Sequence, residues 1–460
     1  GLGDVYKRQT SRIIYVLFFI LLTAIFTCCT IYFINLGRTT IIDNKSTSPD
    51  TINAVNIDGD DTGLSYRTVT IKDFSESPYY KPIKTTKGRE SLSSESEKKL
   101  YDLITKSVTI ISETKDENDH YRTERVNIEG IHMSESEIRR SINAFVFDNP
   151  HIFWLDNLFG YAYVGEDTMV EFYSVISADE CEKKYLVLNS AVNRVMASLE
   201  DGMSEFERER FMHDFVINNC IYKGTVASLS DGWEYFSAYG SIVKGEAVCE
   251  GYAKSMQLLL NLSGIECMTI RGDSEGVGHM WNVVKIDDEW YHLDSTWDDT
   301  TNGAIYDFFN IDDEMIKTSH TISPIVDEVS LDQSKENDLR YNFFIPQCTS
   351  TQAGYYSKNA AVITTFDEET NNKVISALIN AANSKEKYLP IMFGKEMQYE
   401  EYINTLFFNQ PYKFYSYVNS ANEQLDDEHK IDRDGLSIVK NENASLVRVV
   451  LAYTSDSEES

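Results

Sequence analysis

The stretch between Gly245 and Asp294 constrains the fold more than any other part of the chain, because helical and strand-like patterns follow one another within it. Its first part has apolar residues at helical spacing, namely Met256, Leu259 and Leu260. This spacing predicts a helix that begins at or just after Cys249. Three strand candidates follow, at 264–272, 278–286 and 290–296. The order predicts an α+β fold in which one helix packs on an antiparallel sheet.

The last two strand candidates flank Asp287 and Asp288, which we interpret as a two-residue hairpin loop. In that register Trp281 faces Asp294 across the hairpin. His279 lies two residues before Trp281, so it shares the same face of the sheet and is diagonal to Asp294. The pattern therefore places an imidazole beside a carboxylate.

Cys249 combines with this pair to suggest thiol chemistry. The free N–H groups and the dipole of a helix N-terminus favour a thiolate and can hold an oxyanion. Gly245 and Gly251 allow a tight backbone around the cysteine. A thiol enzyme needs a base that reaches the sulfur and a third group that fixes the tautomer of the base. We predict Cys249 as nucleophile, His279 as base and Asp294 as orienting carboxylate.

The run from Ser237 to Asp299 resembles the catalytic core of the transglutaminase-like superfamily. The resemblance rests on the Cys249 segment and on the motifs Gly278–Asn282 and Trp290–Trp297, with spacings of 30 and 15 residues between the three candidates. It implies a papain-like fold with the cysteine on a helix and the histidine and aspartate on an antiparallel sheet. It also implies a cross-linking acyltransferase, a peptidase or an amidase, although some relatives are inactive.

Animal members of that superfamily use calcium, but this sequence offers no convincing calcium loop. The acidic stretch Asp58–Gly63 has Val69 where such a loop needs a bidentate carboxylate. We therefore predict no metal and no cofactor.

The neighbours of the three candidates have structural interpretations. His292 shares the strand parity of Asp294 but lies further from His279, so we expect it to be structural; it and His320 are the next candidates for the base. Trp281 and Trp297 are expected to pack around the site, and Asn282 to orient a neighbour. The sequence does not decide whether Tyr239 or Trp233 supplies an additional oxyanion donor.

Three classes of function are compatible with these residues. The first is a thiol enzyme that acts on peptide or amide bonds through a thioester. The second is an inactive relative that binds peptide or cell-wall polymer in the same cleft. The third is a zinc site made of Cys249, His279 and Asp294, which lacks a fourth protein ligand. The intact triad and the surrounding glycines favour the first class.

Charge and hydropathy bear on partners and location. The formal net charge of −31 argues against a nucleic-acid partner and against attachment to an anionic lipid surface. Ile13–Ile34 has 22 uncharged residues, which is long enough to cross a bilayer as a helix. Basic residues precede this run and predict a cytoplasmic N-terminus and an extracytoplasmic site; a cleaved or lipidated signal is the alternative. The expected partner is a protein or peptide substrate, including components of the cell envelope.

Pattern changes along the chain predict six regions. Residues 1–9 resemble non-native sequence from a fragment end, 10–38 form the membrane anchor, and 39–95 form a disordered linker rich in Ser, Thr and Asp. Residues 96–200 are expected to be mainly helical, 201–320 to form the core, and 321–460 to form a small α/β domain with a short acidic tail. Seven cysteines leave one disulfide open, within the set Cys181, Cys220, Cys267 and Cys348.

Overall fold

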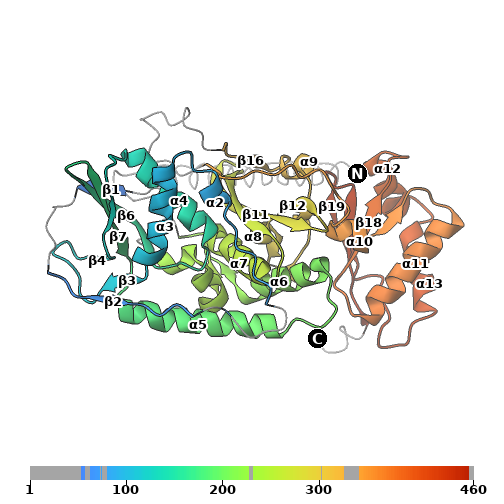
Figure 1. Cartoon of the computed structure of the whole chain (residues 1–460). Helices are drawn as coiled ribbons and strands as arrows, with labels where there is room; N and C mark the ends of the chain where they lie inside the picture. Colours follow the sequence, from blue (N-terminus) through green and yellow to red (C-terminus); the bar gives the residue numbers. More distant parts are fainter. Residues whose placement is uncertain are drawn as a thin grey trace, which may run out of the picture. The chain divides into compact units, whose positions relative to one another are not determined.

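A five-stranded antiparallel sheet with strand order β15-β12-β11-β10-β16 forms the centre of the core. Figure 1 labels its strands β11, β12 and β16. The computed structural model describes residues 53–56, 63–72, 74, 80–226, 232–301, 303–325 and 341–454. The sheet consists of β10 (Cys267–Ser274), β11 (Val277–Ile286), β12 (Glu289–Leu293), β15 (Phe309–Ile311) and β16 (His320–Ile322).

The hairpin between β11 and β12 has the predicted register. Ile286 pairs with Glu289, and Asp287 and Asp288 form the loop with φ of 49° and 68°. Two successive left-handed residues match the right-handed twist of the flanking strands, and aspartate tolerates this conformation better than most residues.

Helix α7 (Cys249–Leu262) packs on one face of this sheet and begins at the predicted residue. The amide of Asn282 on β11 donates to the Ala253 carbonyl at 2.9 Å, so it ties the sheet to the first turns of the helix. Helix α6 (Glu205–Asn219) lies against α7 and begins with a capping box formed by Ser204 and Glu207. A second, smaller apolar cluster includes residues of β10 and β11. It consists of Met268, Ile270, Trp281, Val283, Ile316 and Cys348.

Short elements complete the core. Strand β8 (Ile221–Tyr222) pairs with β9 (Glu246–Ala247), and β13 (Asp299–Thr300) pairs with β14 (Gly303–Ala304). The short helices are η2 (Trp233–Phe236), η3 (Gly240–Lys244), α8 (Ser295–Asp298), α9 (Asp313–Ile316) and α10 (Tyr355–Asn359).

Residues 96–200 were predicted to be mainly helical, and they also contain most of a second sheet. Helices α3 (Glu95–Ser107), α4 (Glu135–Asp148) and α5 (Ala178–Ala197) accompany strands β3 (Ile110–Ser112), β4 (Tyr121–Arg122), β5 (Val126–Ile128), β6 (Leu155–Val164) and β7 (Asp167–Ser174). The longest strands, β6 and β7, carry the alternating aromatic residues that the sequence shows there. Such alternation is a strand signal, and it overrides the helical signal of the flanking segments.

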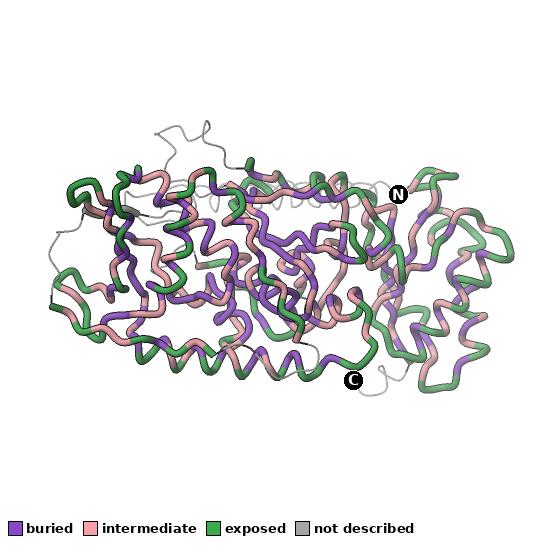
Figure 2. Tube along the Cα trace, viewed as in Figure 1, coloured by how far each residue is buried: buried purple, intermediate pink, exposed green. Residues whose placement is uncertain are grey.

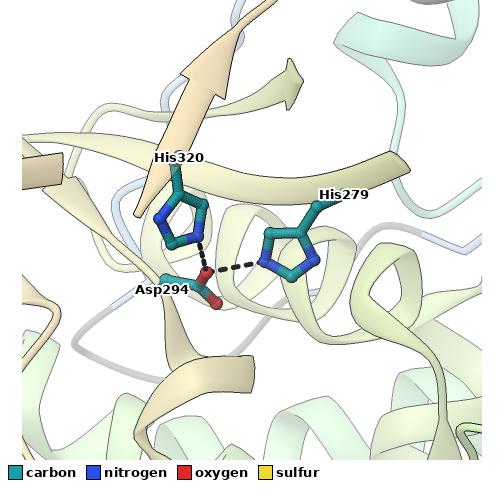
Figure 3. Close-up of side chains that lie close together, drawn as sticks. All are labelled: His279, Asp294 and His320. Carbon is teal, nitrogen blue, oxygen red and sulfur yellow. Dashed lines mark hydrogen bonds and ion pairs between the residues drawn. The ribbon is translucent and has the colours of Figure 1, made fainter. Parts of the chain in front are cut away.

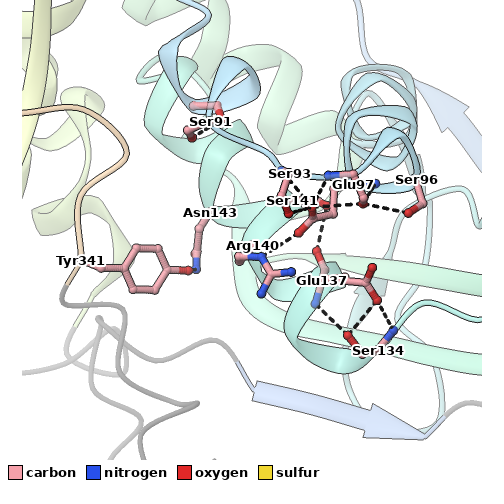
Figure 4. Close-up of polar contacts among 12 residues, drawn as sticks. Ser91, Ser93, Ser96, Glu97, Ser134, Glu137, Arg140, Ser141, Asn143 and Tyr341 are labelled. Atoms are coloured by element: carbon pink, nitrogen blue, oxygen red, sulfur yellow. Dashed lines mark hydrogen bonds and ion pairs between the residues drawn. The ribbon is translucent and has the colours of Figure 1, made fainter. Parts of the chain in front are cut away.

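Polar contacts hold α3 and α4 together (Figure 4). The Glu97 side chain is buried, caps the N-terminus of α3 and accepts a hydrogen bond from Arg140 Nε on α4 at 2.6 Å. Ser134 and Glu137 form a second capping box at the start of α4. A buried carboxylate is tolerated here because both a guanidinium and backbone N–H groups satisfy it.

The prediction of a disordered linker over 39–95 is wrong for its described part. Strands β1 (Asn53–Asn56) and β2 (Tyr66–Thr68) pair with β6 and β3, and α2 (Lys87–Glu90) contacts α4. Val69, Phe74 and Leu92 are buried in the main core. These apolar residues have no periodicity of their own, so only tertiary packing reveals their role.

The C-terminal domain has its own apolar core (Figure 2). It contains β17 (Ala361–Ile363), α11 (Glu368–Asn383), β18 (Tyr388–Phe393), α12 (Tyr399–Ile403), η5 (Asn404–Phe408), α13 (Lys413–Asn422), β19 (Ser437–Asn441) and β20 (Leu446–Val450). Helices and strands both occur in this domain, in agreement with the predicted α/β character. The predicted start at residue 321 is wrong, because β16 joins the core sheet and Phe343 and Ala353 lie in the main core.

Two predictions fall on other residues. The proposed anchor Ile13–Ile34 and the stretch 1–9 lie outside the described residues. None of the helices in the described ranges is long and apolar enough to span a bilayer. The sequence allowed one disulfide among Cys181, Cys220, Cys267 and Cys348. It is not formed, because the five described cysteines are all free thiols.

Candidate active site

Cys249 is the first residue of α7, and its helix end is open. The N-cap residue Val248 has extended backbone and provides no side-chain cap. A Cβ on Gly251 would lie 2.7 Å from both the Ala247 side chain and the Tyr235 carbonyl, so glycine is required for the close packing beneath this turn. Cys249 is partly exposed, whereas the other described cysteines are buried.

The structure brings the three predicted residues together. His279 on β11 donates from Nε2 to Asp294 Oδ2 at 2.6 Å, and the Cys249 sulfur lies near the imidazole, where it helps to raise the imidazole pKa. Because Nε2 is used by Asp294, the nitrogen available to the sulfur is Nδ1. The arrangement is a line from sulfur through imidazole to carboxylate.

Asp294 is fixed by the end of β12 and the start of α8. It is the N-cap of α8, and its Oδ1 accepts from the N–H groups of Thr296 and Trp297 at 2.9 and 3.2 Å. Its own N–H donates to the Phe308 carbonyl at 3.0 Å. The side chain is fully buried, so its orientation is set by these contacts.

A second histidine, which the sequence ranked only as a reserve candidate, reaches the same carboxylate (Figure 3). His320 on β16 donates from Nε2 to Asp294 Oδ2 at 3.1 Å. It follows a stretch without clear periodicity, and no spacing rule connects it to His279. Only the pairing of β16 with β10 brings it to the site.

Electrostatics favours an ion pair between His279 and Asp294. Burial lowers the pKa of His279, but the nearby Asp294 carboxylate and the Cys249 sulfur outweigh it and raise the pKa to about 10. Burial alone would raise the pKa of Asp294, whereas His279 and His320 hold it well below its ordinary value. The imidazole is therefore cationic and the carboxylate anionic at neutral pH.

The remaining candidates have structural positions. His292 is buried, accepts from Trp281 Nε1 at 3.1 Å and donates to Asp313 at 3.0 Å. Trp281 stacks near His279, with ring centroids 5.9 Å apart. Tyr239 and Trp233 pack against Phe153 in an aromatic stack. This position gives neither of them a contact that would single it out as the oxyanion donor.

Two sets of potential ligand atoms converge within 4.8 Å in the described part of the chain. One is His279, Asp294 and His320, and the other is His292, Asp313 and Cys348. In both, the histidine nitrogens already donate to the carboxylate. Neither set includes Cys249, so the zinc alternative built on this cysteine has no support from the geometry.

A cleft lies beside the first turns of α7. Its lining combines polar side chains with aromatic ones, which include Phe147, Trp233, Phe236 and Phe343. Glu250, Lys254 and Arg271 contribute charges, with Lys254 paired to Glu250 at 2.6 Å. Glu250 is the residue after Cys249, but the lining of this cleft includes neither Cys249 nor His279.

A cysteine at a helix N-terminus, facing a histidine and an aspartate on an antiparallel sheet, defines the papain-like class of thiol-enzyme folds. Within that class, residues 192–295 match the model of the transglutaminase-like superfamily. This part of the chain is therefore a transglutaminase-like core, and the predicted fold class is confirmed.

The relatives cover only part of the chain. Kyphoscoliosis peptidase from Mus musculus is 25% identical over 142 residues, which is 27% of this chain and 21% of that protein. The Homo sapiens protein of the same name is 27% identical over 111 residues, covering 22% and 17%. The chain thus spans about a fifth of the length of these relatives. A crystal structure of a TGase overlaps 46% of this chain and 61% of its own, at 14% identity and a TM-score of 0.25.

Proposed function

We propose that this chain is a thiol enzyme that acts on peptide or amide bonds through a thioester at Cys249. The observation that carries the proposal is the line of contacts from Cys249 through His279 to Asp294, at an open helix end. A cationic imidazole beside the thiol favours the thiolate, which is the nucleophilic form.

The reaction follows from these positions. The Cys249 thiolate attacks the carbonyl carbon, and N–H groups at the start of α7 stabilise the oxyanion. The His279 imidazolium gives its proton to the departing amine, the carbon–nitrogen bond breaks, and a thioester with a neutral imidazole remains. Water or a second amine then attacks the thioester, its proton passes to His279, and the sulfur leaves as thiolate.

The acceptor decides between hydrolysis and acyl transfer. A peptidase or amidase uses water, whereas a cross-linking enzyme uses a primary amine. A protein or peptide substrate is the expected class, because the proposed thioester chemistry acts on peptide or amide bonds. The name of the curated relatives, a peptidase, favours hydrolysis of peptide bonds.

Acyl-enzyme trapping tests the proposal directly. The full chain is incubated with a library of peptide amides, with and without a biotinylated primary amine, and digested for mass spectrometry. We expect an acyl adduct on Cys249 that is lost in Cys249→Ala. Amine incorporated into product would identify acyl transfer, and release of free acid alone would identify hydrolysis.

A second candidate is a binding domain that has the fold without turnover. Brief alkylation with iodoacetamide separates the two at the level of the thiol. Burial raises the pKa of Cys181, Cys220, Cys267 and Cys348, so these four thiols serve as internal controls and should react slowly. Fast labelling of Cys249 combined with no acyl adduct from any peptide would favour the binding domain.

We also propose that the site lies outside the cytoplasm, tethered by the apolar run Ile13–Ile34. A cell-envelope protein or peptide is then the natural substrate. Protease added to cells with an accessible envelope should remove the C-terminal part of the chain. Complete protection would place the site on the other side of the membrane.

A further inference from the structure

We infer that His320 is a positioning residue for the reaction, and that it holds Asp294 in the orientation that His279 requires. The inference rests on the proposed function, because it assigns a role toward the same thiol. It extends the line of contacts by one strand, from Asp294 to His320 on β16. Figure 3 shows the contacts of His279 and His320 with Asp294.

The carboxylate of Asp294 has four donors and each has a defined direction. Two backbone N–H groups of α8 occupy Oδ1. His279 and His320 both donate to Oδ2, at 2.6 and 3.1 Å. Asp294 is fully buried, so water does not replace a lost donor. Without His320, one side of Oδ2 would face aromatic rings, and the carboxylate would lose the contact that opposes His279.

The surroundings of His320 direct its Nε2 toward Asp294. Its side chain is fully buried, and its ring centroid lies 5.0 to 5.5 Å from those of Trp281, Trp297 and Phe308. Its Nδ1 lies 2.8 Å from Ser319 Oγ. With the Ser319 hydroxyl as donor to Nδ1, the ring N–H that points at Asp294 is on Nε2.

The backbone is built to bring this histidine close. Strand β16 pairs with the end of β10, where Ser274 is opposite His320 and Gly272 is opposite Ile322. A Cβ on Gly272 would lie 2.0 Å from the Thr321 carbonyl and 2.8 Å from the Trp281 ring. Glycine at 272 is therefore needed for β16 to approach the sheet, and this approach places His320 on Asp294.

These contacts fix a proton as well as a position. An Asp294 carboxylate held by His320 keeps its Oδ2 lone pair on His279 Nε2–H. That contact leaves His279 Nδ1 toward Cys249, as thiolate formation and proton delivery to the leaving amine both require. A packing role alone would need only an aromatic or apolar ring at 320.

Two substitutions separate a donor from a filler. His320→Gln keeps a side-chain N–H that can reach Asp294, whereas His320→Leu fills the space without a donor. We expect the rate constant for Cys249 alkylation by iodoacetamide to stay within about threefold of wild type in the first variant. It should fall by about 10- to 100-fold in the second, because a hydrogen bond to a buried charge is lost. With a substrate in hand, kcat should fall by a similar factor at unchanged KM.

His292→Leu is the matched control, because His292 is also fully buried and bonded to an aspartate, Asp313, but does not touch Asp294. Its alkylation rate should stay near wild type. Ser319→Ala provides a milder variant if His320→Leu does not fold. Its alkylation rate constant should fall by about three- to tenfold, because the preference of His320 for the Nε2–H tautomer is weakened. Circular dichroism checks folding in each variant.

The outcomes divide cleanly. His320→Leu reacting as fast as His320→Gln would overturn the inference and leave 320 a packing position. If His320→Leu does not fold, a wild-type alkylation rate in Ser319→Ala would overturn it as well. The expected order of alkylation rates, in a chain that forms no acyl adduct, would support the inference while the proposed function fails.

Discussion

At the scale of single residues, Asp294 and His279 are expected to contribute differently to turnover. His279→Ala removes the proton carrier for both the sulfur and the leaving amine, so activity on a peptide amide should fall to background. Asp294→Asn keeps the imidazole but loses the charge that stabilises its cation. The comparable change in serine enzymes costs about 10⁴ in rate, and a more acidic thiol should reduce the loss to the order of 10² to 10³. Adding Cys249→Ala to either variant should cause little further loss, because the three act as one unit.

The same pair should make stability depend on pH. The pKa of His279 is raised from 6.5 to about 10, so its contribution is complete below pH 6.5 and is lost as the pH rises toward 10. The pKa of Asp294 is lowered from 3.8, so its contribution is complete above pH 3.8 and is lost at lower pH. The difference in melting temperature between wild type and Asp294→Asn should be largest between these limits and shrink from pH 6.5 to 10.

Asp313→Asn is the control for this experiment. Its partner His292 has a lowered pKa because of burial, so that pair gains no such dependence above pH 6.5. A melting-temperature difference for Asp294→Asn that is as flat as the control would contradict an ion pair at the site.

Residue spacing predicted three of the four polar side chains that meet at the site. A helix start between two glycines predicted Cys249. The positions of His279 and Asp294 on one face of a hairpin predicted that pair. Both are local patterns, and local patterns can be read along the chain. His320 lies 26 residues beyond Asp294 and reaches it only because β16 crosses to β10. That contact depends on tertiary pairing, which no period in the sequence records.

At the scale of elements, a buried carboxylate on α6 limits stability at alkaline pH. Glu209 is fully buried, its Oε2 accepts from Asn310 on β15 at 2.6 Å, and burial raises its pKa from 4.5 to about 8. Between those values the folded chain keeps a proton that the unfolded chain releases, so stability falls as the pH rises. Glu209→Gln cannot ionise, and it should be more stable than wild type at pH 8 by about 1 to 3 kcal/mol.

Urea unfolding at pH 5 and pH 8 measures this effect. The advantage of Glu209→Gln should be small at pH 5 and grow toward pH 8. Glu166→Gln, at an exposed position in the turn after β6, should show no such trend. Equal stability of wild type and Glu209→Gln at pH 8 would show that the carboxylate is not buried as described.

Elements were predictable where their own residues carried the pattern. Helix α7 and the β11–β12 hairpin have clear periods, and they formed where expected. The sheet of β6 and β7 was underestimated because the helices on either side have stronger signals. Strand β2 and the buried Phe74 lie in a polar stretch with few apolar residues. The burial of such isolated residues depends on tertiary contacts, which the local sequence does not show. The domain boundary failed for the same reason, since residues 341–354 pack on the core without a periodic pattern.

At the scale of the whole molecule, one ion pair joins the C-terminal domain to the core near the site. Arg448 on β20 donates to Asp307 at 2.9 Å, and Tyr356 and Asn441 donate to the same carboxylate. The next residue, Phe308, accepts the N–H of Asp294 and donates its own N–H to Asp298. A shift of Asp307 would therefore be transmitted through one peptide unit to the carboxylate at the site.

Arg448→Met tests this connection. Both side chains of the pair are about nine-tenths buried, so removing the guanidinium leaves a buried carboxylate unpaired and should cost about 3 to 5 kcal/mol. Asp307→Asn alone should lower the free energy of unfolding by less than Arg448→Met. The double variant should be no less stable than Arg448→Met, because both substitutions remove the same ion pair. Lys440→Met removes an exposed pair with Glu400 on the same domain and should cost under about 1 kcal/mol.

Since the two domains have separate apolar cores, calorimetry of Arg448→Met should show two unfolding transitions further apart than in wild type. Cys249 alkylation should slow in the same variant and stay normal in Lys440→Met; unchanged alkylation in a destabilised Arg448→Met would mean that the pair holds the domains together without reaching Asp294.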